Sequence, residues 1–353
     1  MNKERFMIAV ILLAAVLLVF VALDRRPVVA VFTDSESNFM EGIERYLNEN
    51  GVPFKIVEIR IDNRSIHEIN DILRRNAIHY AIGPRLSTQA SELIKPVLEQ
   101  NNVFAVSPTV TSPNVVGKSP YLISLMPSDE VQTQAVANRI IQDDAKSVAL
   151  FCDSQNPIYT DYYVKRIGSL LREAGVECRT IYLLSDLDKM DVDVHSFDAA
   201  VMVTSEKNAA MVCQFLRKNG YTGKMYGSDY CFGTQLIKLG GESVEEMVVF
   251  STIDFQRMSA SGLYSYEAGA AYDAASIVNE LLSYKIDPQD AGEYLREKEF
   301  DGITGSYSFD ENLKLQRNVF FVRIENGQFV GENEVSVTGQ LPLPSLMLRK
   351  GLA

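Results

Sequence analysis

The sequence predicts an α/β protein built from two doubly wound lobes, each with a parallel β-sheet. Strand-like and helix-like patterns alternate along most of the 353 residues, which is typical of parallel sheets covered by helices on both faces. The alternation starts afresh at Pro127-Ser128-Asp129, which indicates a second unit. Two neighbouring strands within Tyr80–Asn114 end in hydroxyl-rich loops, and ligands bind at the carboxyl ends of parallel strands.

The first unit is predicted to contain four strands. The expected strands are Val28–Phe32, Phe54–Ile61, Tyr80–Ile82 and Val103–Val106, and the helices between them are Phe39–Asn48, Ile66–Asn76 and a third with Ser87 as its N-cap. The loop Thr33–Asn38 after the first strand contains no glycine, so it is not a dinucleotide-binding fingerprint. The last strand leads into Ser107, Thr109, Thr111 and Ser112.

The second unit repeats the same alternation. Its expected helices are Val131–Ile141, Tyr163–Ala174 and Ala209–Lys218, and its strands are Ser147–Phe151, Val176–Leu184, Ala199–Val203 and Lys224–Gly227. A loop containing Asn156, Pro157 and Tyr159 is expected before the second of these helices. A long helix follows at Leu263–Tyr284, whose many alanines and glycines suit close packing. Asn326-Gly327, between Val319–Ile324 and Phe329-Val330, predicts a β-hairpin.

The amino terminus carries an export signal. Lys3 and Arg5 precede Phe6–Leu23, a run of eighteen apolar residues without a charge. This run is long for the core of a signal peptide, and it is followed by no small-residue cleavage site and no lipoprotein cysteine. We therefore expect residues 1–26 to be an uncleaved transmembrane signal anchor with a cytoplasmic amino terminus, and a cleaved signal peptide is the alternative. Either arrangement exports the rest of the chain.

The composition excludes several functions. A formal net charge of −12 argues against nucleic-acid binding, which needs clustered lysine and arginine. The three histidines stand apart from any nucleophile motif; His79 lies roughly 13 Å along its strand from the ligand edge, so we expect no enzyme. The cysteines lack metal-ligand spacing, and Cys152 and Cys178 could form a disulfide only if their Cα atoms approach each other.

The order of motifs resembles the type I periplasmic binding proteins of the branched-chain amino acid (Leu/Ile/Val) receptor family. The resemblance covers about Val28 to Val330 and depends on IGPRLSTQA at 82–90, VFAVSPTVTSP at 103–113, YEAGAAYDAA at 266–275 and FDGITGSYSFD at 300–310. It implies two lobes joined by a three-strand hinge and closing on a ligand. Lobe 1 would be residues 27–125 plus 254–316, lobe 2 would be 126–253 plus 317–332, and 333–353 would form a carboxyl-terminal tail.

The resemblance also implies a ligand site. Ser87 and Thr111 match positions that hold the ligand carboxylate through hydroxyl and amide groups, and Thr109 would offer its carbonyl. Tyr159 matches a tyrosine lining the cleft, Ser205 stands where a second aromatic is usual, and Asp229 matches an acidic residue that meets the ligand's ammonium group. A zwitterionic amino acid needs such donors at one end and a carboxylate at the other.

Ordinary structural roles compete with these assignments. Ser87 could only cap its helix, and Thr109 and Thr111 could only be turn residues. Asp229 could be solvated and Tyr159 could pack at the rim. Arg85 could attract an anionic ligand, but we expect a solvated side chain there. Departures from the family at the cleft rim, such as the short loop Thr33–Asn38 and the absence of a regular helix in Ser185–Phe197, leave an amino-acid ligand less certain than the fold.

Together these observations predict an extracytoplasmic solute-binding protein, in the periplasm or at the cell surface. It would bind a small polar ligand, an amino acid or a related amide, deliver it to an ABC transporter permease and use no cofactor. The alternative is a membrane-anchored sensor or adaptor that regulates a partner protein through the same cleft.

Overall fold

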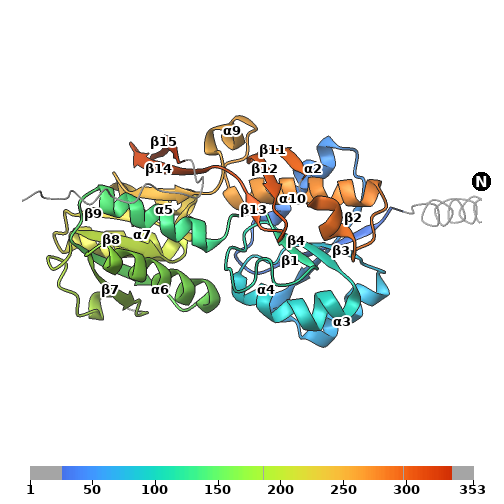
Figure 1. The fold of residues 1–353 in the computed structure, drawn as a ribbon, viewed down its shortest axis with the longest axis horizontal. Coiled ribbons are helices and arrows are strands. Elements are labelled where there is room, and N and C mark those ends of the chain that lie inside the picture. Colours follow the sequence, from blue (N-terminus) through green and yellow to red (C-terminus); the bar gives the residue numbers. More distant parts are fainter. Residues whose placement is uncertain (1–25, 186, 297, 336–353) are drawn as a thin grey trace, which may run out of the picture.

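The computed structural model describes residues 26–335, apart from residues 186 and 297 (Figure 1). The expected signal anchor at 1–26 therefore lies outside the described residues except for Arg26, as does most of the carboxyl-terminal tail. Within the described ranges, no helix is long and apolar enough to span a membrane.

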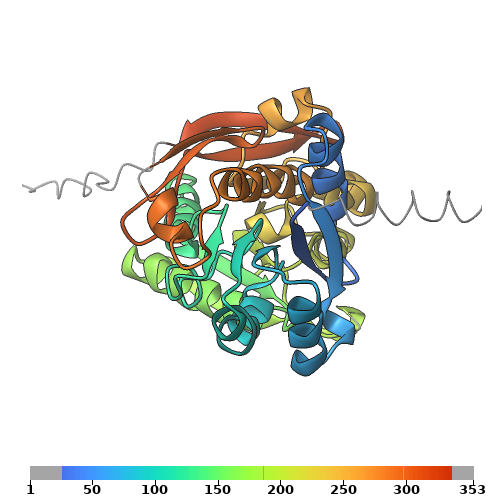
Figure 2. The ribbon, with the colours of Figure 1, turned by 90° about the vertical axis from the view of Figure 1, so that its right-hand side faces the viewer.

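The first sheet has five parallel strands in the order β2-β1-β3-β4-β5, a doubly wound arrangement. Its strands are β1 (Val28–Thr33), β2 (Lys55–Arg60), β3 (Tyr80–Ile82), β4 (Phe104–Ser107) and β5 (Leu122–Ser124). Helices α3 (Ile66–Arg75) and α4 (Ser87–Leu93) cover one face, and α2 (Phe39–Glu49) and α10 (Tyr266–Ser283) cover the other (Figures 1 and 2). A π-helical segment, Ile94–Glu99, continues α4.

The second sheet has seven strands in the order β15-β14-β10-β9-β8-β6-β7. Its strands are β6 (Ser147–Cys152), β7 (Glu177–Tyr182), β8 (Ala199–Val203), β9 (Lys224–Gly227), β10 (Val248–Ser251), β14 (Val319–Glu325) and β15 (Gln328–Val335). The first five of these are parallel and repeat the winding of the first sheet, whereas β14 and β15 form the predicted hairpin and add antiparallel to β10. The helices are α5 (Asp129–Gln142), α6 (Pro157–Glu173), α7 (Glu206–Lys218) and α8 (Thr234–Gly240).

The remaining elements follow β10. They are α9 (Phe255–Ala260), α11 (Ala291–Leu295) and a small antiparallel sheet of β11 (Glu299–Gly302), β12 (Gly305–Phe309) and β13 (Leu315–Gln316). In Figure 1 the two large sheets lie side by side along the long axis, with α9, α10 and the small sheet on one side of them. The α/β class with parallel sheets is thus confirmed.

Both faces of each large sheet carry an apolar core. Strand β8 illustrates the reason, because all five of its residues, AAVMV, are buried, as expected for a parallel strand covered on both sides. The small residues expected in the long helix do permit close packing. A Cβ atom on Gly42 of α2 would lie 1.8 Å from the carbonyl oxygen of Ala268 in α10.

Several local expectations were wrong. Helix α6 begins at Pro157, because proline needs no amide partner in the first turn, so Tyr159 lies in a helix rather than a loop. Leu86, not Ser87, occupies the N-cap position of α4. Cys152 and Cys178 cannot form a disulfide, since Cys178 pairs with Val148, four residues away from Cys152 along β6.

Candidate functional site

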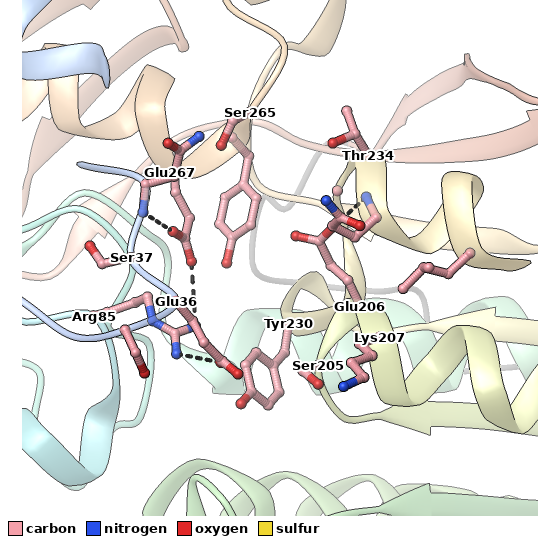
Figure 3. A pocket seen from close by; sticks show the side chains of 16 residues that line it. Glu36, Ser37, Arg85, Ser205, Glu206, Lys207, Tyr230, Thr234, Ser265 and Glu267 are labelled. Carbon is pink, nitrogen blue, oxygen red and sulfur yellow. Dashed lines mark hydrogen bonds and ion pairs between the residues drawn. The ribbon is translucent and has the colours of Figure 1, made fainter. Parts of the chain in front are cut away.

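The carboxyl ends of strands from both large sheets border two adjoining spaces. The outer cleft has a volume of about 500 Å³ and is lined by residues 35–38, Arg85, residues 205–207, Tyr230, residues 233–235, Leu239 and residues 265–267 (Figure 3). The inner pocket has a volume of only about 20 Å³, which is room for one water molecule. Arg85, Tyr230 and Tyr266 line both spaces and separate them.

The residues singled out in the sequence divide between these spaces. Thr109, Thr111, Tyr159 and Asp229 line the inner pocket, and Ser205 lines the outer cleft. Ser87 lines neither. It is 1 % exposed, and its hydroxyl accepts a hydrogen bond from the backbone amide of Ser112 at 3.2 Å.

The loop after β4 is fixed by hydrogen bonds to the neighbouring strand–helix junctions. The hydroxyl of Thr109 donates to the carbonyl of Arg85 at 2.7 Å, so this side chain orders the β3–α4 turn. The carbonyl of Thr111 accepts from the amide of Asp129, the first residue of α5, at 3.0 Å. Both threonines therefore connect elements around the pocket, whatever else they contact.

Tyr159 and Asp229 contact each other directly. The Tyr159 hydroxyl donates to Oδ1 of Asp229 at 3.1 Å, and the Asp229 amide donates to the side-chain oxygen of Gln132 at 2.9 Å. Asp229 follows β9 and is buried, because a short 3₁₀ turn folds its side chain back toward α5 and α6. It is therefore not the solvated loop residue of the competing interpretation.

A second buried carboxyl group lies beside Asp229. Asp129 is 0 % exposed, and its Oδ2 has no hydrogen-bond partner among the described residues. Burial raises the pKa of Asp129 well above its usual range, and the neighbouring Asp229 adds to the effect; burial likewise raises the pKa of Asp229. The sequence did contain a signal for Asp129, in the Pro127-Ser128-Asp129 helix start, but nothing in it indicated proximity to Asp229.

Arg85 is not solvated, contrary to the expectation. Its side chain is 9 % exposed and is shared by three carboxylates: Asp34 at 3.0 Å, Glu36 at 3.0 Å and Glu267 at 3.5 Å. Burial by itself would lower the pKa of Arg85, but Glu267 and Asp34 raise it above its ordinary value. The guanidinium group is therefore committed to partners from the β1–α2 loop and the start of α10.

Two further glutamates that the sequence did not indicate lie in the wall of the outer cleft. Glu267 accepts from the amide of Asn38 at 3.0 Å, and burial raises its pKa to about 7, although Arg85 acts in the opposite direction. Glu206 accepts from the amide of Gln235 at 2.8 Å, and burial also raises its pKa. Gly233 is required for this contact, because a Cβ atom there would lie 2.1 Å from Oε1 of Glu206.

Ser205 takes the N-cap position of α7, although its side chain makes no capping hydrogen bond. Figure 3 shows it beside Lys207 at the floor of the outer cleft. Among the described residues, no group of three or more histidine, cysteine, aspartate or glutamate side chains is placed to hold a metal ion. The arrangement provides hydrogen-bond donors, carboxylates and two tyrosine rings, which suits recognition of a polar small molecule.

Comparison with solved structures gives many matches. The leucine-binding protein LivK from Thermotoga maritima has a TM-score of 0.76 at 19% identity, with 88% of this chain and 98% of that chain covered. The branched-chain amino acid substrate-binding protein LivJ from Streptococcus pneumoniae, in complex with isoleucine, has a TM-score of 0.72 at 17% identity, with 87% and 98% covered. A solute-binding protein of an ABC transporter from Rhodopseudomonas palustris, in complex with benzoate, has a TM-score of 0.74 at 11% identity, with 87% and 95% covered.

No protein-family model and no curated protein matches the sequence. At identities below 20%, the structural likeness establishes the fold, which is that of type I periplasmic binding proteins. The isoleucine and the benzoate in those structures are ligands of those proteins.

Proposed function

We propose that this chain is an extracytoplasmic solute-binding protein that closes on a small polar ligand for uptake by an ABC transporter. The observation that carries the proposal is the position of the cleft, which is bordered by the carboxyl ends of strands from two sheets with the same winding. A ligand there contacts both sheets at once, so its binding favours the state in which they are close together.

The fold neighbours support this function. Proteins of similar length and fold bind leucine, isoleucine, benzoate and 4-hydroxybenzoate, all small molecules that carry a carboxylate. For this chain we keep an amino acid or a related amide as the ligand. Ser87, Thr109, Thr111, Tyr159, Ser205 and Asp229 remain its proposed binding residues, Ser87 through the loop that it holds in place.

The proposal includes the expected organisation of the chain. Lobe 1 comprises 27–125 and 254–316, lobe 2 comprises 126–253 and 317–332, and three strands form the hinge between them. Residues 1–26 anchor the protein to the cytoplasmic membrane and leave the lobes outside it. The partner is a permease that receives the ligand, and catalysis is not part of the role.

A thermal melt of the full-length protein in mild detergent tests the function, with a panel of amino acids, amides and small carboxylates. A ligand at 100 times its Kd should add about 2.7 kcal/mol to the free energy of unfolding. Asp229→Asn and Thr111→Val should abolish the shift, whereas Thr180→Val, on the exposed side of β7, should keep it. If the panel leaves the melting temperature unchanged, the uptake function is wrong.

One observation favours the sensor or adaptor as a second candidate. The inner pocket is filled by the chain's own side chains, and Arg85 already has three carboxylate partners. A protein with this arrangement could hold its closed form without a solute and present that form to a partner protein. The same panel separates the candidates, since an adaptor of this kind shows no shift with any solute.

A further inference from the structure

The amino ends of the strands of the first sheet lie together at one surface of the molecule. The carbonyl of Pro27, just before β1, accepts a hydrogen bond from the amide of Lys55, the first residue of β2, at 2.8 Å. Because β1–β5 are parallel, their carboxyl ends, which border the cleft, lie at the opposite edge. The six residues of β1 put about 20 Å between this surface and the cleft. We call it the amino face, and its residues include Pro27, Ala77, His79 and Lys285.

A hollow of about 370 Å³ opens on the amino face. Its wall is largely apolar and includes Val28, Tyr80, Leu282, Ile286 and Pro288. Lys285 and Asp287, two exposed residues of the lining, have opposite charges, so together they add no net charge. His79 adds a positive charge only when it is protonated. The hollow therefore suits a zwitterionic surface better than a free anion or cation.

Tyr284 exposes a large ring beside this hollow, since it follows α10 directly and precedes Lys285. It is 67 % exposed, more than any other large hydrophobic side chain among the described residues. The centroid of its ring lies 5.9 Å from that of Tyr294, and the ammonium group of Lys298 lies 5.8 Å from it. Tyrosine rings with a cation nearby are typical of the boundary between water and lipid, where the ring is buried and the polar groups stay wet.

The amino face also lies close to the proposed membrane anchor. The apolar run ends at Leu23, and only residues 24–27 separate it from β1. Four residues span at most about 14 Å, and the headgroup layer outside the hydrocarbon core takes up about 5–8 Å of that distance. When the run spans the membrane, the amino face therefore stands no more than about 10 Å above the headgroups.

We propose that the amino face rests on the lipid surface, with the Tyr284 ring at the level of the headgroups and the hollow over them. This inference rests on the proposed anchor and adds an orientation to it. The first sheet lies next to the membrane, and β7 of the second sheet lies toward the other end of the long axis from β2 and α10 (Figure 1). A membrane partner that reaches the cleft must therefore project about 20 Å from the lipid, the length of β1.

Fluorescence quenching of the full-length protein in phosphatidylcholine vesicles tests the inference. The chain contains no tryptophan, so Tyr284→Trp supplies a single reporter. Phosphatidylcholine with a nitroxide on its headgroup should quench this reporter at least about twofold, because the ring lies among the headgroups. Tyr182→Trp, on β7 and 56 % exposed, is the matched control and should keep its fluorescence.

A second reporter keeps the test independent of one substitution. His79→Trp, on an exposed residue of the amino face, should be quenched as Tyr284→Trp is. Melting temperatures identify any variant that fails to fold.

Sedimentation with the vesicles separates this inference from the anchor. If the variants sediment but both amino-face reporters fluoresce as Tyr182→Trp does, the inference is overturned and the anchor stands. Equal quenching at all three positions would show that no face is preferred and would also overturn it. If the wild-type protein stays in solution, the anchor is wrong and the inference fails with it.

Discussion

Asn156 and Thr88 connect the helices of the two large sheets. The backbone amide and the hydroxyl of Thr88, the second residue of α4, both donate to Oδ1 of Asn156, at 3.2 and 3.1 Å. The Thr88 hydroxyl also accepts from the amide of Ile158 in the first turn of α6, at 3.3 Å. Because α4 follows β3 and α6 follows β6, these bonds join the carboxyl-end loops of one sheet directly to those of the other.

Replacing Thr88 should loosen this connection. Thr88→Val keeps the shape but removes the hydroxyl, so two hydrogen bonds are lost, and we expect a loss of about 1–2 kcal/mol in the free energy of unfolding. Thr88→Ser, which keeps the hydroxyl, should lie close to wild type. Urea denaturation measures both, and small-angle scattering should show a larger radius of gyration for Thr88→Val. Equal stability of the two variants would contradict the role of this contact.

The Tyr159–Asp229 hydrogen bond should contribute to stability as well as to the site. Tyr159→Phe leaves the buried Oδ1 of Asp229 without its donor, and we expect a loss of about 1–3 kcal/mol. The matched control is Tyr162→Phe, on a half-buried side chain of the same helix, which should change stability by less than about 0.5 kcal/mol. A Tyr159→Phe protein as stable as the control would show that the bond is absent in solution.

Glu267 should make the protein less stable as the pH rises. Its pKa is raised from 4.5 to about 7, so between these values the folded protein binds more protons than the unfolded chain. Stability from this group is thus fully present below pH 4.5 and is lost as the pH rises through 7, by about 3 kcal/mol in total.

Glu267→Gln should remove this part of the pH dependence. Urea denaturation of wild type and variant at several pH values between 4.5 and 8 measures it, as the difference between the two curves. Asp129 and Asp229 also have raised pKa values, so they also lower the free energy of unfolding as the pH rises. They do so in both proteins, and their contribution therefore cancels in that difference. Glu44→Gln should follow wild type. Parallel curves for wild type and Glu267→Gln would contradict the prediction.

The contact between α2 and α10 should tolerate no side chain at position 42. A Cβ atom on Gly42 would clash with the backbone of Ala268, which can move only together with the rest of α10. We therefore expect Gly42→Ala to lower the free energy of unfolding by about 3 kcal/mol or more. Gly168→Ala, inside α6, is the control, because its nearest neighbour is the flexible end of Arg172 at 3.2 Å. We expect Gly168→Ala to raise the free energy of unfolding by about 0.5–1 kcal/mol, because alanine has the higher helix propensity. Thermal unfolding compares the two.

The sequence predicted most of the fold because buried parallel strands have a distinct pattern. Tyr80–Ile82, Ala199–Val203 and Lys224–Gly227 were predicted with their observed bounds, and the first two are apolar runs between helices or loops. Strands β5 and β10 were missed. They are as short as β3 and β9, and their pairing with neighbouring strands defines them.

The candidate site was only partly predictable. The alternation of strands and helices led to the edge of the sheets that borders the pocket, and hence to Thr109 and Thr111, because the carboxyl ends of parallel strands meet there. Asp229, which lines the same pocket, was indicated only by the family resemblance. The pattern could not reveal whether Ser87 faces a ligand or the Ser112 amide. That choice depends on how the loop after β4 folds back onto α4.

By itself, the sequence determined the class of fold, the edge of the sheets that borders the cleft and the hairpin at Asn326-Gly327, all consequences of local pattern and chain direction. Only the tertiary structure decided the environment of Arg85. Its carboxylate partners come from the loop after β1 and from the start of α10, and folding brings them to one wall of the cleft, where Asp34 and Glu267 are buried and Glu36 stays exposed. The strength of a charge interaction depends on the distance between the groups and on their burial, and the sequence alone specifies neither quantity.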